Sequence, residues 1–207
     1  MSTDDWYALP VLAGRLVRLE PLALEHADGY LAAARGDEDL LRWVNTPGSR
    51  ATGTIGTFED ARADVLAALA ARARGERFAY AQLDTANGTF AGTTSLYDVS
   101  PALRTLAIGH TWLGRRWRRT GHNTESKLLL LTHAFQTLGA ARVVWHTDVR
   151  NERSQAAIAR LGATREGELR KHRLRRDGSW RTTVQYSMTD DDWPAARERL
   201  TSRLAQR

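Results

Sequence analysis

Apolar and polar residues alternate over several short stretches of the chain, and this period of two predicts β-strands. Single strands are expected within residues 14–22 and 103–113, and a β-branched run at 141–149 fits a buried strand. Two longer stretches, 77–99 and 167–188, predict hairpins. Their turns are expected at Asn87–Gly88, which would supply the positive φ angles of a tight turn, and at Asp177–Gly178.

Other stretches place apolar residues three or four positions apart, which is the spacing of an amphipathic helix. Helices are expected within residues 23–35, 57–75, about 120–138, 151–163 and 191–205. Thr57 and Asp60 have the spacing of a capping box, and Gly75 is placed to end the same helix. Pro194 suits the first turn of the last helix.

Helices and strands interleave along the chain, and several strands are joined as hairpins. This order predicts an α/β protein with a mixed, mostly antiparallel central sheet flanked by helices. The 207 residues contain no linker-like stretch and no internal repeat. We therefore expect one domain, 1–207, with a core at about 15–188 and a C-terminal helix at about 191–205.

Composition excludes several kinds of site. The chain has no cysteine, which excludes disulfides, thiolate metal sites and a cysteine nucleophile, and no metal site is expected. The acidic N-terminus does not resemble a secretory signal, and the longest aliphatic run, Leu128–Leu131, is too short to cross a bilayer. These features predict a soluble, cytoplasmic protein with no membrane partner.

The formal net charge of +6 favours anionic partners, such as nucleic acid, phosphate-bearing cofactors or acidic surfaces. One stretch, Arg115–Phe135, places arginines and a glycine directly before an apolar helix. The helix face expected to pack on the sheet consists of Leu128, Leu131, Phe135 and Leu138. Its first turn would leave amide groups unpaired from about Thr120 to Glu125. With Arg118, Arg119 and the freedom of Gly121, these amides suit a phosphate.

A purely structural explanation of this stretch stays open. Gly121 could be only a turn residue, Asn123 or Thr124 an N-cap, and the arginines a solvated loop. Neither a P-loop nor a dinucleotide-binding glycine pattern occurs in the chain, and the HExxH and GxSxG motifs are absent as well.

The segment RRTGHN, Arg118–Asn123, resembles the Arg/Gln-x-x-Gly-x-Gly/Ala loop of the GCN5-related N-acetyltransferases (GNAT). IGHTWL before it is similar to the central strand of that family, and NERSQAAIARLGA to its Asn-x-x-Ser helix. The last hairpin also resembles the family's ending, so the ordered motifs cover about Arg15–Met188. The chain looks most like the branch of ribosomal-protein N-terminal acetyltransferases (RimJ/RimL-like).

This resemblance implies a GNAT-like acyl-CoA N-acyltransferase fold with acetyl-CoA as co-substrate. The loop would bind its pyrophosphate, a break in the central strand near Trp112 and Leu113 would pair with the pantetheine arm, and Asn151 would bind a pantetheine amide. The cofactor-binding residues implied are Trp112, Leu113, Arg118, Arg119, Thr120, Gly121, His122, Asn123, Thr124 and Asn151.

Three positions depart from the family pattern. Asn123 replaces the last small residue of the loop, Ala107 stands where relatives often carry glutamate, and Ile158 where many carry a catalytic tyrosine. Direct attack of an amine on the thioester needs neither a metal nor a covalent intermediate, so positioning could still support transfer. The base and the acid are therefore the least constrained parts of the site.

Ser154 is the candidate hydrogen-bond donor to the departing thiolate, because it shares a helix face with Ile158 and Leu161. Both Asn151 and Ser154 have structural alternatives, since these residue types are favoured at helix starts. His110 and His172 are candidate bases that could titrate near neutrality, whereas His122 and His146 are interpreted as structural.

The predicted function is transfer of an acetyl group to a primary amine, on a protein N-terminus or a small molecule, in a ternary complex. A catalytically silent acetyl-CoA-binding domain is one alternative. A nucleic-acid-binding protein using residues 115–119 and 170–176 is another, less favoured because few aromatic residues accompany these clusters. The second cluster would favour an acidic or phosphate-bearing acceptor, although alternation divides its charges between two faces. A homodimer also stays open.

Overall fold

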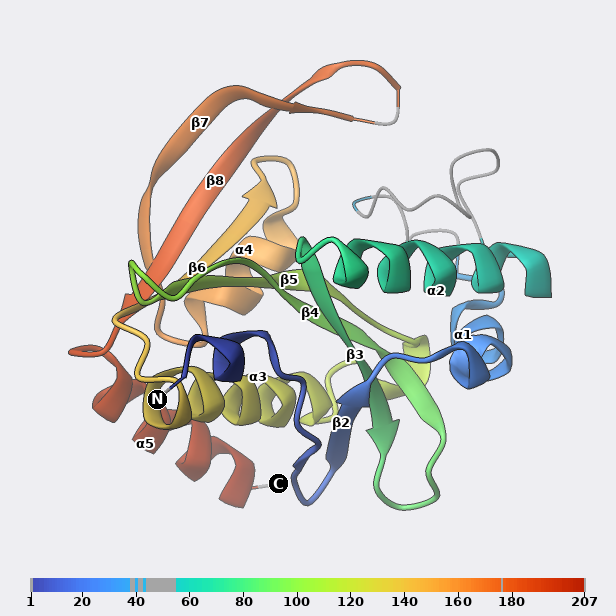
Figure 1. The fold of residues 1–207 in the computed structure, drawn as a ribbon, viewed down its shortest axis with the longest axis horizontal. Helices are drawn as coiled ribbons and strands as arrows, with labels where there is room; N and C mark the ends of the chain where they lie inside the picture. The colour runs from blue at the N-terminus through green and yellow to red at the C-terminus, as the bar shows by residue number, and fades with distance from the viewer. Residues whose placement is uncertain (1, 38–39, 41–42, 44–54, 176, 207) are drawn as a thin grey trace.

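The computed structural model describes residues 2–37, 40, 43, 55–175 and 177–206. Within them, eight strands form one sheet in the order β1-β2-β3-β4-β5-β6-β8-β7 (Figure 1). The strands are β1 Leu12–Ala13, β2 Val17–Pro21, β3 Arg77–Asp84, β4 Phe90–Ser100, β5 Thr105–Leu113, β6 Arg142–Asp148, β7 Thr164–Leu174 and β8 Trp180–Thr189. β5 and β6 are parallel, and the other neighbours are antiparallel. The expected mixed, mostly antiparallel α/β sheet is confirmed.

The helical elements are η1 Thr3–Tyr7, η2 Leu24–His26, α1 Ala27–Ala34, α2 Phe58–Ala73, η3 Arg115–Trp117, α3 His122–Thr132, the π-helical η4 His133–Thr137, α4 Glu152–Ala159 and α5 Trp193–Ala205. The predicted capping box of α2 is confirmed. The Thr57 hydroxyl accepts the Asp60 amide at 3.1 Å, and the Asp60 carboxylate accepts the Thr57 amide at 2.9 Å. None of the described helices is long and apolar enough to cross a bilayer.

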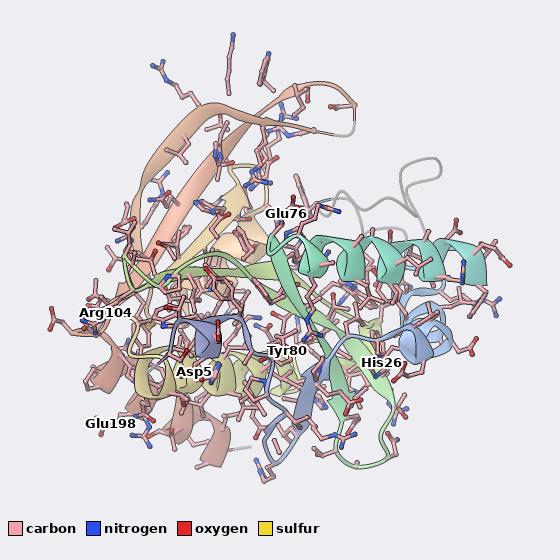
Figure 2. All side chains as sticks on the ribbon, viewed as in Figure 1. Asp5, His26, Glu76, Tyr80, Arg104 and Glu198 are labelled. Atoms are coloured by element: carbon pink, nitrogen blue, oxygen red, sulfur yellow. The ribbon has the colours of Figure 1, made fainter. Side chains whose placement is uncertain are left out.

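The helices lie in two layers on opposite faces of the sheet (Figure 1). Successive residues of β3 point into different layers. Phe78 and Tyr80 belong to the core that contains residues of α3, α4 and α5. Ala79 and Ala81 belong to the core beneath α1 and α2. Figure 2 shows Tyr80 at the centre of the molecule, where it is fully buried. The sheet is therefore covered on both sides along β3.

Two local expectations need correction. On α3, Leu130 and Leu131 are fully buried, while Leu128 is half-buried, because Lys127 takes a position that faces the sheet. At the first hairpin, Gly88 alone of the pair has a positive φ, of 72°. The Asn87 side chain instead accepts the Thr89 amide at 3.0 Å, so the turn is a longer loop than expected.

Candidate active site

The central strand β5 has an irregularity in the middle of the sheet. Ser95 of β4 faces Gly109, but Thr93 already faces Trp112, so His110 and Thr111 together lie opposite Thr94. This is a β-bulge. His110 has a φ of 48°, in the left-handed region that residues other than glycine seldom adopt.

β5 also separates from β6 on approaching the bulge. Their parallel pairing covers Thr105–Ala107 against Arg142–Val144, and the described residues show no further pairing between the two strands. The β5 main chain from Ile108 onward therefore has no β6 partner in the described residues, and side chains donate to several of its carbonyls, including those of His110 and Leu113. The break was expected near Trp112 and Leu113, but these residues pair with Thr93 and Gly92 of β4, and the bulge lies two residues earlier.

The segment after β5 leads through η3 to the start of α3. Gly121 is the N-cap and has φ 115° and ψ −24°, a left-handed conformation in which a side chain would be strained. No side chain caps this helix. The Glu125 amide donates to the Gly121 carbonyl at 2.9 Å, so the amides without a helical partner are those of His122, Asn123 and Thr124. The expected range, about Thr120 to Glu125, was too long at both ends.

Side chains of this loop form hydrogen bonds within the segment before α3 and at its first residue. The Thr120 hydroxyl donates to the Trp117 carbonyl at 2.6 Å and lies 2.8 Å from Nδ1 of His122. The Trp117 indole in turn donates to Asp84 at 2.8 Å. The suggestion that Asn123 or Thr124 is the N-cap was wrong, because the cap is Gly121.

Arg118 has contacts that its sequence position did not reveal. Its guanidinium donates to the Leu113 carbonyl at 2.9 Å and to the buried carboxylate of Asp37. Arg118 therefore braces the loop against the end of β5, and a phosphate contact by this side chain stays a prediction. Arg119 has a φ of 63°, which turns the chain just before Gly121.

Two buried charged residues of α3 attach the helix to the strands. The Glu125 carboxylate accepts the amides of Arg15 at 3.0 Å, Leu16 at 2.6 Å and Val17 at 2.8 Å. Two residues later, Lys127 points at the β5 bulge from the α3 side of the sheet. It is 4% exposed.

The Lys127 amine makes hydrogen bonds to both strands at the bulge. Nζ donates to the Thr94 hydroxyl at 2.8 Å and to the Thr111 hydroxyl at 2.9 Å, and the two hydroxyls lie 2.9 Å apart. Burial lowers the pKa of Lys127 to about 7. The sequence signal for this residue was a lysine at the sheet-facing position of an otherwise apolar helix stripe.

At α4, the structural explanation of Asn151 is confirmed. Its side-chain oxygen accepts the Ser154 amide at 3.1 Å, which caps the helix. Ser154 is half-buried, while Ile158 and Leu161 on the same face belong to the core. Any contact of Asn151 or Ser154 with a substrate stays a prediction.

The opposite face of the sheet carries a cluster of aromatic and imidazole rings from four strands. The rings of Tyr97 and His110 are 5.4 Å apart at their centroids, and those of His146 and His172 are 5.8 Å apart. The Tyr97 hydroxyl lies 3.1 Å from Nδ1 of His146, which joins the two pairs. Gly109 makes room for this arrangement, because a Cβ there would lie 2.8 Å from the Tyr97 ring.

His146 was interpreted as structural, yet it connects the cluster to an ionic chain. Its Nε2 lies 3.1 Å from the Gln185 side-chain oxygen, and the Gln185 amide donates to Glu166 at 3.0 Å. Glu166 is paired with Arg142, and that hydrogen bond lowers the pKa of Glu166 to about 2. His110 and His172 belong to the same ring cluster, in which Tyr97 and His146 lie between them. The Ser154 amide instead donates a hydrogen bond to Asn151.

The expectation that His110 and His172 titrate near neutrality is not supported. The pKa of His110 is lowered to about 3. The main cause is loss of hydration of the ring, and the positive charges of Arg77, Arg173 and Arg181 add to it. His110 keeps an exposed surface, so solvent screens these charges in part. The pKa of His172 is also lowered, first by loss of hydration and then by the charges of Arg173 and Arg181. Both imidazoles are neutral at pH 7, and neither is a strong base.

The remaining features of the described residues add no site. A cavity of about 810 Å³ lies near Trp6, Ser100 and Leu138, at the opposite end of α3 from Gly121, and no predicted site residue lines it. No group of three or more potential metal ligands occurs within the described ranges.

Comparison with known proteins agrees with this geometry. Residues 16–164 match the family model described as an acetyltransferase (GNAT) domain. A Bacillus subtilis (strain 168) protein, YdaF, provisionally named a ribosomal N-acetyltransferase, is 31% identical over 107 residues, which is 52% of this chain. The match spans 57% of that protein's length, little more than half.

Solved structures share the fold. One from T. thermophilus, provisionally described as an acetyltransferase, has a TM-score of 0.82 and 37% identity, covering 95% of this chain and 98% of the other. Mycobacterium smegmatis RimJ, solved in complex with CoA-disulfide, has a TM-score of 0.73 and 24% identity, covering 94% of this chain and 92% of RimJ. At that identity RimJ supports the fold alone.

Proposed function

The chain belongs to the GNAT acetyltransferase family, and from this premise we propose that it transfers an acetyl group from acetyl-CoA to a primary amine. One observation carries the proposal: β5 separates from β6 just before a bulge and leads through η3 to a helix whose N-cap is a glycine. Along one path, this arrangement leaves the β5 main chain without a neighbouring strand and the first amides of α3 without helical partners.

The residues present fit acetyl-CoA as a co-substrate. The amides of His122, Asn123 and Thr124 lie at the positive end of the α3 dipole, which suits a pyrophosphate. The β5 main chain between residues 108 and 113 would pair with the amides of the pantetheine arm, as a strand pairs with its neighbour. A β5 amide at the bulge would donate to the thioester oxygen as negative charge develops there.

The amine must be neutral to attack the thioester carbon, and its proton must leave. A free α-amine, with a pKa of about 8, reaches this state at neutral pH more readily than a lysine side chain, with a pKa of about 10.4. Neutral His110 and His172 can accept a hydrogen bond from the amine, and water can carry the proton away. Ser154 would donate to the departing thiolate.

The acceptor is proposed as a protein N-terminus or a small amine. The name of YdaF, which is similar to this chain over about half of each protein, supports a ribosomal acceptor. A catalytically silent acetyl-CoA-binding domain is the second candidate. Ala107 and Ile158 occupy positions where relatives often carry glutamate and where many carry a catalytic tyrosine. Nucleic-acid binding is weakened because Arg115 and Arg118 of its first cluster already contact Asp37.

Calorimetric titration with acetyl-CoA tests the proposal. We expect micromolar binding by the wild type and loss of at least about 100-fold in affinity in Gly121→Glu, which places a carboxylate among the phosphate-binding amides. Gly139→Glu is the matched control, because Gly139 also has a positive φ, of 63°, but lies beyond the other end of the α3 and η4 helices.

Thiol release in the presence of amines then separates an enzyme from a silent binder. A folded wild type that does not bind acetyl-CoA would contradict the whole proposal. Equal binding by Gly121→Glu and wild type would contradict the placement of the pyrophosphate.

A further inference from the structure

Two arginines of the β7–β8 hairpin face each other without an acidic partner. Arg173 of β7 and Arg181 of β8 are direct partners in the antiparallel register. Directly opposed residues point to the same face, so the two positive side chains lie side by side. Like charges in this position destabilise a hairpin, and opposite charges stabilise it. The arrangement therefore needs a reason other than stability.

That shared face is the one that carries the ring cluster. Gln185 contacts His146 of β6, and alternation along β8 places Thr183 and Arg181 on the same side as Gln185. The hairpin arches over this side of the sheet (Figure 1), and many nitrogen-tipped side chains gather along it (Figure 2). Arg173 and Arg181 thus project from the face that carries His110 and His172, the two residues proposed to contact the acceptor amine.

A third guanidinium approaches the same place from β3. Arg77 donates to the Ser95 hydroxyl at 2.9 Å, and Ser95 is the register partner of Gly109 at the bulge. The charges of Arg77, Arg173 and Arg181 all act on His110 and lower its pKa. β3, β7 and β8 therefore bring positive charge near the His110 imidazole, at the β5 bulge where acetyl transfer is proposed.

Among the described residues, no carboxylate forms an ion pair with any of these three arginines. The carboxylates whose charges reach the cluster are Asp64, Asp98 and Asp148. Asp148 is already bound by Arg175 through two hydrogen bonds, of 2.7 and 3.0 Å. Nε of Arg181 is buried without a hydrogen-bond partner. A donor in this state lacks an acceptor that a ligand can provide. Arg176 of the same basic cluster lies outside the described residues.

We propose that Arg173 and Arg181, with Arg77 across the sheet, bind an anionic group of the acceptor, a carboxylate or a phosphate on the molecule whose amine is acetylated. Guanidinium groups suit both anions because their planar donors match pairs of oxygens. The inference rests on the proposed function, since it assigns the class of amine that this site would select.

Matched pairs of acceptors test the inference by thiol release with acetyl-CoA. The pairs are an amino acid and its amide, phosphoethanolamine and ethanolamine, and a peptide with aspartate or asparagine after its N-terminal residue. We expect at least about a tenfold higher kcat/KM for the anionic member of one or more pairs. The pair that responds tells whether the anion belongs to a small molecule or to a peptide.

In the variant Arg173→Gln/Arg181→Gln, the preference should fall to near unity through a higher KM for the anionic acceptor, with the KM of the neutral acceptor unchanged. The matched control is Arg165→Gln. Arg165 lies on β7 opposite Tyr186, whose side chain belongs to the core on the other face. Wild-type ratios near unity in every pair, or a preference that survives in the double variant, would overturn the inference.

A separate measurement covers the case in which acetyl-CoA binds but no amine is acetylated, which would refute the proposed activity alone. Protein saturated with coenzyme A is titrated with inorganic phosphate, so that the α3 amides are already occupied. Tighter phosphate binding by the wild type than by the double variant would support the anion site. Equal binding by the two proteins would contradict it.

Discussion

Lys127 offers a test of the buried network beneath the β5 bulge. Replacing it with methionine keeps an unbranched side chain of similar length and removes the amine. The Thr94 and Thr111 hydroxyls lie 2.9 Å apart and can still bond each other. The variant Lys127→Met should therefore fold, and the comparison with the wild type isolates the effect of the amine.

The magnitude follows from the two pKa values of the lysine. Burial lowers its pKa from 10.5 to about 7 in the folded protein. Between these values the unfolded chain binds a proton that the folded protein does not, so the stability of the wild type rises with pH. Each pKa unit is worth about 1.4 kcal/mol, and the full effect is therefore about 5 kcal/mol, present as a penalty below about pH 7 and absent above about pH 10.5.

Urea unfolding at a series of pH values measures this effect. From about pH 6 to pH 9.5, the stability of the wild type relative to Lys127→Met should rise by about 3 kcal/mol. Lys171→Met is the control, because Lys171 is the only other lysine and is exposed. The reasoning would be refuted if the difference in free energy of unfolding between wild type and Lys127→Met changed by less than about 0.5 kcal/mol over this range. The folded protein would then not lower the pKa of Lys127.

Two further substitutions test residues of the site. Ser154→Ala should lower turnover at least about tenfold while acetyl-CoA affinity stays near that of wild type, because the thiolate loses its donor; equal turnover would remove Ser154 from the mechanism. Glu125→Ala leaves three backbone amides without their acceptor and should lower the free energy of unfolding by about 3 kcal/mol. Glu152→Ala, at an exposed position in α4, is the control for urea unfolding, and equal losses in the two variants would refute the role of Glu125.

The features that could be predicted from the sequence depend on local spacing. Thr57 and Asp60 lie three residues apart and cap α2 because both partners belong to one turn of chain. Gly121 was identifiable for the same reason, since a glycine directly before an apolar helix indicates a backbone conformation with positive φ that other residues seldom adopt. Local signals of this kind also gave the order of strands and helices.

The features that could not be predicted depend on partners far along the chain. The bulge at His110–Thr111 is set by the register with β4, and its left-handed residue is a histidine and not a glycine. Arg173 and Arg181 share a face, but β7 changes register between Leu169 and Arg173, so counting alternate residues fails there. Asp37, which holds Arg118, is 81 residues away from it in sequence.

The burial of Lys127 also determines which amines of the protein could compete with an external acceptor. The chain has two lysines, and one of them is enclosed beneath the sheet. Lys171, on the hairpin that carries His172, is the single exposed side-chain amine. Acetylation of the protein's own side chains would therefore be confined to one position, and the background from side-chain amines in an assay could be removed by a single substitution.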